Sequence, residues 1–266
     1  MADLRADALF ASAHAAPITA LRTFRLLLSY DGTDFHGWQV QPEAPTVQGA
    51  VLEAARRFLG PEARLIGASR TDAGVHALRQ TASLTLDSHL DAAAVHGALN
   101  AALPPAVRVL RVEEAPAGFD ARRAAIGKRY AYLIDNAAVA APLWRRLAWH
   151  VPGAIDVEAM RTALSALRGR HDFSAFCAAP GREADPMCRI QALHVVRKRE
   201  RLAIVVSADR FLHHMVRNIV GSAVEVGRGA RSPRWLAEVL ASRDRTRAGP
   251  TAPAQGLVLV RVRYRG

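Results

Sequence analysis

The chain has 266 residues, half of them apolar, which is long enough to bury the core of one large domain or of two smaller ones. Its 36 Lys and Arg residues outnumber its 24 Asp and Glu residues. The resulting formal charge of +12 favours phosphate-bearing partners, although a high-GC genome, which favours arginine, would produce the same excess. No apolar stretch reaches the about 18 residues of a membrane span, and the two cysteines lack zinc-ligand spacing. We therefore expect a cytoplasmic protein without membrane contact, whose residues 1–21, which lack the apolar core of a secretory signal, form a disordered or weakly ordered extension.

The first half of the chain alternates between predicted strands and predicted helices. Apolar runs and period-2 alternation indicate strands over residues 25–30, 80–87 and 107–112. Two amphipathic segments begin at N-capping residues and stop at Gly-Pro or Pro-Pro pairs, so helices are predicted from Thr46 to Gly60 and from Asp91 to Leu103. A boundary is expected near residues 115–125.

The second half repeats this plan with additions. Strands are predicted over residues 128–134, 190–196, 202–207 and 258–264, and the charged residues between the middle two favour a hairpin. Helices are predicted from Asp156 to Gly169, over residues 211–226, and from Ser232-Pro233 to Leu240.

This order of elements predicts an α+β fold. We expect two ferredoxin-like, RNA-recognition-like halves, residues 22–120 and 121–266, that share a largely antiparallel sheet with helices on one face. The cleft between the halves, or the open face of the sheet, is then available to a ligand.

The segment 68–77 (ASRTDAGVHA) has the composition of a functional loop. Its small residues and glycine indicate a turn just before a strand, and catalytic side chains concentrate on loops held by a rigid scaffold. Asp72 is the candidate functional residue, although its carboxylate is also suited to pair with Arg70 or to cap a turn. Asp72 and His76 are four residues apart and would suit a metal-dependent hydrolase, but two ligands without a third are a weak metal signal.

Six separated blocks of the sequence resemble one enzyme family. The blocks are 69–76, 30–33 with 37–39, 127–130, 169–173, 211–221 and 252–257. These blocks resemble segments of the TruA-type tRNA pseudouridine synthases, and they occur in the same order along the chain. The resemblance implies the pseudouridine synthase fold and an isomerase that needs neither metal nor organic cofactor. Ser69 departs from the family pattern, which usually has glycine there.

The resemblance implies catalytic roles for three residues. Asp72 matches the family's aspartate, which attacks the ribose or takes its 2′ proton to give a glycal. Arg217 matches the active-site arginine, and we expect it to pair with Asp72 and to oppose the pKa rise that desolvation causes; a solvated helix arginine is the alternative. Tyr130 matches the tyrosine that stacks on the target base and assists proton transfer at C5, whereas alternation alone makes Tyr130 and Tyr132 equal core candidates.

Further residues are candidates for binding the substrate. Arg70 would bind a phosphate or help to flip the target base out, and Leu257 would pack on that base unless it is plain core. Phe35, Trp38 and Gln39 mix aromatic and polar side chains in one loop, as RNA contacts do, and Trp38 is equally suited to anchor the core. Basic clusters are candidate phosphate contacts, and some of them are expected to be ordinary solvated faces: 122–123, 128–129, 145–146, 197–201 and 243–247.

The same resemblance implies a substrate and an assembly. The substrate would be uridine at positions 38, 39 and 40 of the tRNA anticodon stem-loop, and the enzyme would be a homodimer with one tRNA reaching across both subunits. A non-catalytic tRNA-binding module or chaperone on the same fold is the competing hypothesis. It would need basic clefts but not Asp72, Tyr130 and Arg217 together, so their joint presence favours the enzyme.

Overall fold

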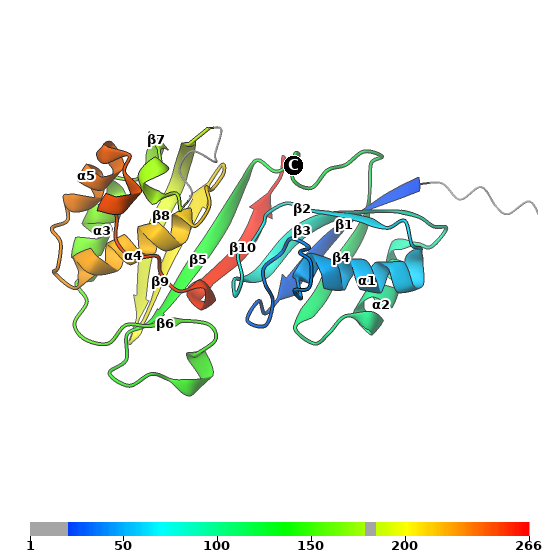
Figure 1. Ribbon diagram of the computed structural model, residues 1–266, viewed down its shortest axis with the longest axis horizontal. Helices are drawn as coiled ribbons and strands as arrows, with labels where there is room; N and C mark the ends of the chain where they lie inside the picture. The colour runs from blue at the N-terminus through cyan, green and yellow to red at the C-terminus, as the bar shows by residue number, and fades with distance from the viewer. Residues whose placement is uncertain (1–20, 179–184, 266) are drawn as a thin grey trace, which may run out of the picture.

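A single sheet runs through the part of the chain that the computed structural model describes, residues 21–178 and 185–265. Its ten strands are β1 (Leu21–Tyr30), β2 (Arg64–Gly67), β3 (His76–Asp87), β4 (Val107–Ala115), β5 (Gly127–Asp135), β6 (Trp149–His150), β7 (Gly169–Asp172), β8 (Met187–Lys198), β9 (Arg201–Ala208) and β10 (Leu257–Arg263). The strand order is β4-β1-β3-β10-β5-β9-β8-β7, with β2 beside β3 and β6 beside β5 (Figure 1). The expected extension over residues 1–21 lies outside the described residues apart from Leu21, which opens β1.

Five α-helices in the described residues pack on this sheet. They are α1 (Val47–Leu59), α2 (Ala92–Ala102), α3 (Val157–Ser165), α4 (Met215–Gly227) and α5 (Trp235–Ser242). Helices α1 and α2 lie over the strands of the first half, and α3, α4 and α5 lie over those of the second half (Figure 1). Paired strands are antiparallel except β10 with β3 and β5 with β6, so the predicted α+β class with a largely antiparallel sheet is confirmed.

Three helices begin at the capping residues that the sequence indicates. The side chains of Thr46, Asp91 and Asp156 each accept a hydrogen bond from the backbone N–H three residues later, at 3.2, 2.8 and 2.9 Å. Each bond satisfies an N–H that has no partner within its helix. These local signals set the starts of α1, α2 and α3 correctly.

The predicted helix over residues 211–226 begins four residues late. His214 has a left-handed backbone (φ 58), so the helical path cannot pass through it, and α4 begins at Met215. Phe211 to His214 form a loop that leads into the helix instead. The side chains of this loop therefore do not follow the helical spacing that their sequence positions suggested.

Two other boundaries were also predicted wrongly. Helix α3 ends at Ser165, and Gly169 (φ 105) opens the short strand β7 instead of closing the helix. Helix α5 begins at Trp235, because the Ser232 carbonyl accepts the Trp235 N–H at 3.1 Å in a turn ahead of the helix. Strands β2 and β7 were not predicted at all, since four residues give too short a pattern for period-2 alternation to be recognised.

Strand β10 joins the two halves of the sheet. It pairs in parallel with β3 (Val258 opposite His76) and antiparallel with β5 (Leu259 opposite Tyr130). This placement puts the loop before β3, the strand β5 and the start of β10 side by side. The division into domains at residue 120 stays a prediction, because one sheet spans both parts.

The buried side chains form one hydrophobic cluster that includes residues of both halves, from Phe24 and Leu28 in β1 to Tyr132 and Ile134 in β5. The Tyr132 hydroxyl, at the inner end of this cluster, donates to the Pro253 carbonyl at 2.7 Å, so its polar atom is satisfied. Within the described residues, every helix falls short of the length and apolar composition needed to cross a membrane.

Candidate active site

A cavity of about 640 Å³ opens where the two halves meet. Its wall comes from the loop before β3, from β5, from the loop that leads into α4, and from the first residue of β10. The lining side chains that matter below are Ser69, Arg70, Asp72, Arg122, Lys128, Tyr130, Arg210, Phe211, His213, His214 and Leu257. Four of the predicted site residues, Arg70, Asp72, Tyr130 and Leu257, therefore line this cavity, and its surface is mostly polar and charged.

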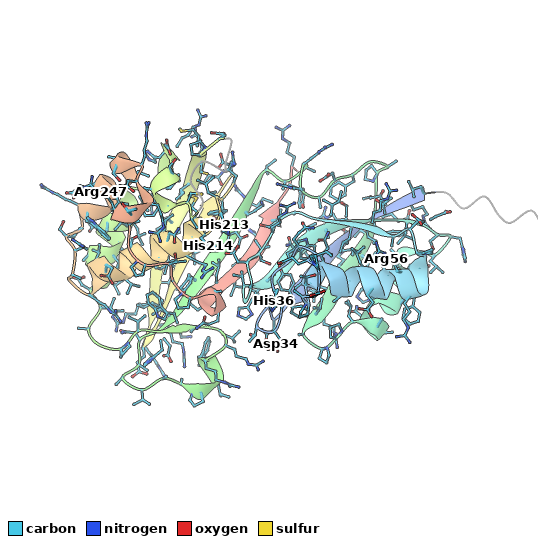
Figure 2. All side chains as sticks on the ribbon, in the orientation of Figure 1. Asp34, His36, Arg56, His213, His214 and Arg247 are labelled. Atoms are coloured by element: carbon cyan, nitrogen blue, oxygen red, sulfur yellow. The ribbon has the colours of Figure 1, made fainter. Side chains whose placement is uncertain are left out.

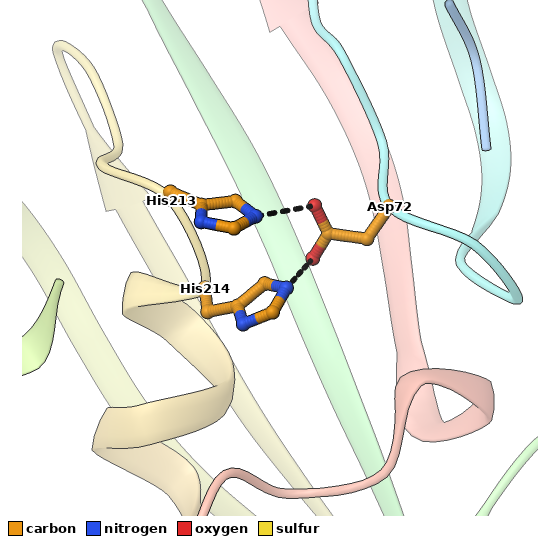
Figure 3. Close-up of side chains that lie close together, drawn as sticks. All are labelled: Asp72, His213 and His214. Carbon is orange, nitrogen blue, oxygen red and sulfur yellow. Dashed lines mark ion pairs between the residues drawn. The ribbon is translucent and has the colours of Figure 1, made fainter. Parts of the chain in front are cut away.

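Asp72 is the centre of a charged cluster. Its Oδ2 lies 3.3 Å from Nη1 of Arg217. The same Oδ2 lies 3.4 Å from Nε2 of His214, and Oδ1 lies 3.9 Å from Nε2 of His213 (Figure 3). The Asp72 side chain keeps 26% of its surface exposed, so the carboxylate remains reachable from the cavity. The expected ion pair between Asp72 and Arg217 is present, across 145 positions of sequence.

Arg217 is held in place by backbone on its other side. Its Nε donates to the Ala252 carbonyl at 2.8 Å, and its own carbonyl accepts the Ala252 N–H at 3.1 Å. The 250–252 segment can approach so closely because α4 has a glycine there: a Cβ on Gly221 would overlap the Pro250 carbonyl oxygen. The Arg217 side chain is only 15% exposed, so the alternative of a solvated helix arginine is wrong.

His213 and His214 were not predicted as neighbours of Asp72. Their rings lie 3.9 Å apart, and both project from the loop before α4 toward the central strands, whereas His36 and Arg56 lie on the first half (Figure 2). Burial lowers the pKa of His214, the charge of Asp72 opposes this shift, and Arg217 and His213 reinforce it. His214 is therefore neutral at pH 7. The two adjacent histidines, four and three residues before Arg217, were the signal in the sequence, and the assumption of a continuous helix obscured it.

Asp72, His213 and His214 are also the residues with the spacing of a possible metal site in the described chain, since their ligand atoms lie within 4.8 Å of one another. The guanidinium of Arg217, which contacts the same Asp72 oxygen, would repel a cation there. His76, the ligand that the sequence suggested, is turned away: its Nδ1 accepts the Gly32 N–H at 3.0 Å and its Nε2 lies 2.8 Å from the Arg146 carbonyl. The pairing of Asp72 with His76 on one metal is thus not supported.

Tyr130 lies buried beside the carboxylate. Its hydroxyl is 2.8 Å from the Ser69 Oγ, and its ring meets Phe211 edge-on with centroids 5.1 Å apart. Burial raises the pKa of Tyr130 to about 12; the hydrogen bond with Ser69 opposes this rise and the charge of Asp72 adds to it. The phenol is therefore protonated at pH 7. Ser69, which replaces the family's glycine, supplies a hydroxyl that glycine lacks.

The other predicted contacts divide into two groups. Arg70 is exposed at the cavity, without a side-chain partner among the described residues, and Leu257 is 6% exposed on the cavity wall. Phe35, Trp38 and Gln39 do not line the cavity, so their contact with RNA stays a prediction.

Trp38 is almost fully buried, at 1% exposure, which agrees with the core alternative. Its ring fills the space over Gly67, where a Cβ would overlap the indole. Its backbone N–H donates to the Thr71 carbonyl at 3.0 Å, and the Thr71 side chain lies 2.8 Å from the Tyr30 hydroxyl. Through its hydrogen bond to Thr71, Trp38 therefore supports the loop that carries Asp72.

Comparisons with known proteins agree on one family. The sequence model described as tRNA pseudouridine synthase matches residues 27–122 and 163–265. A tRNA pseudouridine synthase A from Myxococcus xanthus is 47% identical over 251 residues, which cover 91% of each chain. Proteins of the same name from Xanthobacter autotrophicus and Thermoanaerobacter sp. are 43% and 39% identical, over 91% and 92% of this chain and 99% and 100% of theirs.

Proposed function

Because the chain belongs to the tRNA pseudouridine synthase family and isomerises uridine to pseudouridine in tRNA, we propose that Asp72 is its nucleophile, that Arg217 and Tyr130 complete the active site, and that its targets are uridines 38, 39 and 40 of the anticodon stem-loop. The observation that supports the site is the Asp72–Arg217 ion pair at 3.3 Å beside Tyr130 in a cavity shared by both halves. Because this is a family of enzymes, the alternative of a non-catalytic tRNA-binding module is not favoured.

The reaction breaks the bond between ribose C1′ and uracil N1 and forms a bond between C1′ and C5. A proton leaves C5, and N1 gains one, so the product is an isomer. Asp72 acts at the sugar, by attack on C1′ or by removal of the 2′ proton. The fixed charge of Arg217 lies 3.3 Å from this carboxylate, and it needs no rearrangement during the reaction.

Tyr130 acts in this proposal as a platform for the base. A phenol with a pKa of about 12 holds its proton at pH 7, and its hydroxyl is already engaged by Ser69. It is therefore poorly suited to take the C5 proton, and its ring is suited to stack on uracil that has been flipped out of the RNA. Leu257 lies on the same cavity wall and packs on the base from a second direction.

The Asp72→Asn variant tests the nucleophile. Asparagine keeps the size of the side chain but loses the charge, so we expect normal affinity for unmodified tRNA and no pseudouridine above background. Pseudouridine is read by its specific chemical label, nucleotide by nucleotide, which also reports whether positions 38, 39 and 40 are the targets. Arg228→Met, an exposed change at the end of α4 outside the cavity, is the control. Turnover at the wild-type rate in Asp72→Asn contradicts the assignment.

We also propose a homodimer. The segment between β5 and β6 exposes apolar side chains, with Val139 at 82% and Leu143 at 87%, and such surface suits contact with a second copy. Sedimentation at the concentration used for the activity assay should give twice the mass of one chain. A single-chain mass at that concentration, in a fully active sample, contradicts the proposal.

A further inference from the structure

Lysine is almost absent from this basic chain. It occurs only at positions 128 and 198, so 34 of the 36 Lys and Arg residues are arginine. Lys198 is exposed at the end of β8, next to the hairpin turn. Lys128 is instead partly buried in β5 and faces the active-site cavity. The two lysines thus offer a site residue and a matched surface control within one sequence.

Lys128 has no protein partner for its charge. Among the residues that the structure describes, its ammonium group makes no hydrogen bond or ion pair. It lies two residues before Tyr130 on the same strand face, about 7 Å along the strand, and both side chains line the cavity. A buried charge without a partner is costly, so such a position calls for an explanation in terms of a ligand.

The charges around Lys128 are positive. Burial and the guanidinium groups of Arg122 and Arg210, which also line the cavity, lower the pKa of Lys128 to about 8. Asp209 is a carboxylate that also lines the cavity, and its Oδ1 accepts the backbone N–H groups of Arg189 and Arg210 at 2.8 and 2.7 Å. Arg210 itself is bridged to a carboxylate, so Lys128 and Arg122 are the cations that lack one.

We propose that Lys128, flanked by Arg122 and Arg210, is a phosphate-binding subsite that holds a phosphodiester next to the uridine in the cavity. This inference rests on the proposed function, because it places the target base over Tyr130. An incoming phosphate supplies the negative charge that Lys128 and Arg122 lack and is the anion that RNA carries at every nucleotide. Lysine suits a confined wall because its ammonium is a compact point charge, whereas a guanidinium needs a wider planar space.

The first test compares Lys128→Met with Arg228→Met, an exposed change at the end of α4 that lies outside the cavity and outside the basic clusters named above. Affinity is measured on tRNA that already contains pseudouridine, so that no variant turns it over during the measurement. We expect Lys128→Met to raise the Kd by about tenfold or more, the effect of one charged hydrogen bond, and to reduce the slope of log Kd against log salt by about 0.7 to 0.9. Arg228→Met should leave both values unchanged.

Kinetics separate this subsite from the catalytic proposal. Lys128→Met should raise the KM for unmodified tRNA and retain most of the kcat, whereas Asp72→Asn should lose the kcat and retain affinity. A normal Kd and salt slope in Lys128→Met overturns the subsite and leaves the nucleophile intact. A large loss of kcat with unchanged affinity also overturns it, because Lys128 would then serve the chemistry.

The second test uses the unmutated protein, so it does not depend on how a variant folds. Amine-specific acylation at pH 8 is followed by peptide mass spectrometry, with and without tRNA. Because the pKa of Lys128 is about 8, much of its amine is free to react at this pH. Bound tRNA should protect Lys128 several-fold. Equal reactivity of Lys128 in the two samples contradicts the proposal.

Discussion

Removing the Lys128 charge should stabilise the protein in the absence of RNA. The pKa of Lys128 falls from 10.5 to about 8 on folding, a difference of about 2.5 units. At 1.36 kcal/mol per unit, the charged lysine costs the folded state up to about 3.4 kcal/mol at pH 7. Because the side chain is only partly buried, solvent screening reduces this cost, and we expect Lys128→Met to gain about 1 to 3 kcal/mol in free energy of unfolding.

The sign of the pH dependence follows from the lowered pKa. Below pH 8 the lysine is charged in both the folded and the unfolded states, so the penalty is present in full. As the pH rises from 8 to 10.5, the folded protein releases the proton before the unfolded chain does, and the penalty disappears. The stability gap between Lys128→Met and wild type should therefore be widest at pH 7 and less than half as wide at pH 9.5.

Urea unfolding of wild type, Lys128→Met and Lys198→Met at these two pH values measures the gap. The surface control Lys198→Met should stay within about 0.5 kcal/mol of wild type at both. The reasoning is refuted if Lys128→Met is less stable than wild type at pH 7, since its methylene chain would then matter more than its charge. A gap that does not change with pH refutes it as well.

Three other variants test the surroundings of Asp72. Arg217→Met removes the fixed charge 3.3 Å from the carboxylate. The kcat should therefore fall by about 100-fold or more, while the Kd for tRNA changes far less. Equal losses in kcat and in tRNA affinity would point to a binding role. Ser69→Gly removes the hydroxyl beside Tyr130 and should lower the free energy of unfolding by about 1 kcal/mol with activity retained; an inactive Ser69→Gly would show that the serine is required. The pKa of His214 is lowered in the folded protein, so the folded state resists protonation of this side chain. Wild type should therefore lose thermal stability as the pH falls below about 6.5, and His214→Gln should lose less. Parallel melting curves against pH for the two proteins would exclude His214 as the cause.

Local signals predicted much of the fold. Thr46, Asp91 and Asp156 were recognised as caps because a capping bond spans only three residues, and the long alternating strands were found because each shows its own periodicity. The start of α4 was missed, because its apolar periodicity continues through His214, whose left-handed backbone no pattern of residue types reveals.

The site depended on information that residue patterns do not hold. Asp72 and Arg217 are brought together by the sheet, and only a family resemblance linked them beforehand. The histidines beside Asp72 and the edge-on contact of Phe211 with Tyr130 follow from the path of one loop, and they became visible with the structure. The environment of Lys128 is likewise a product of packing, since its sequence neighbours indicate only a basic cluster.

The activity depends on strand β10, which is one of the last segments of the chain to be synthesised. Its residues pair with β3, which is synthesised much earlier, and its first residue, Leu257, lines the cavity. The segment just before it contains Ala252, whose carbonyl accepts a hydrogen bond from Arg217. A nascent chain that has not yet emerged to residue 263 lacks the central strand between the two halves. In such a chain β3 and β5 are not joined beside the cavity, so we expect it to be inactive. Contacts between segments so distant in sequence also form slowly, so acquisition of activity should lag behind release from the ribosome.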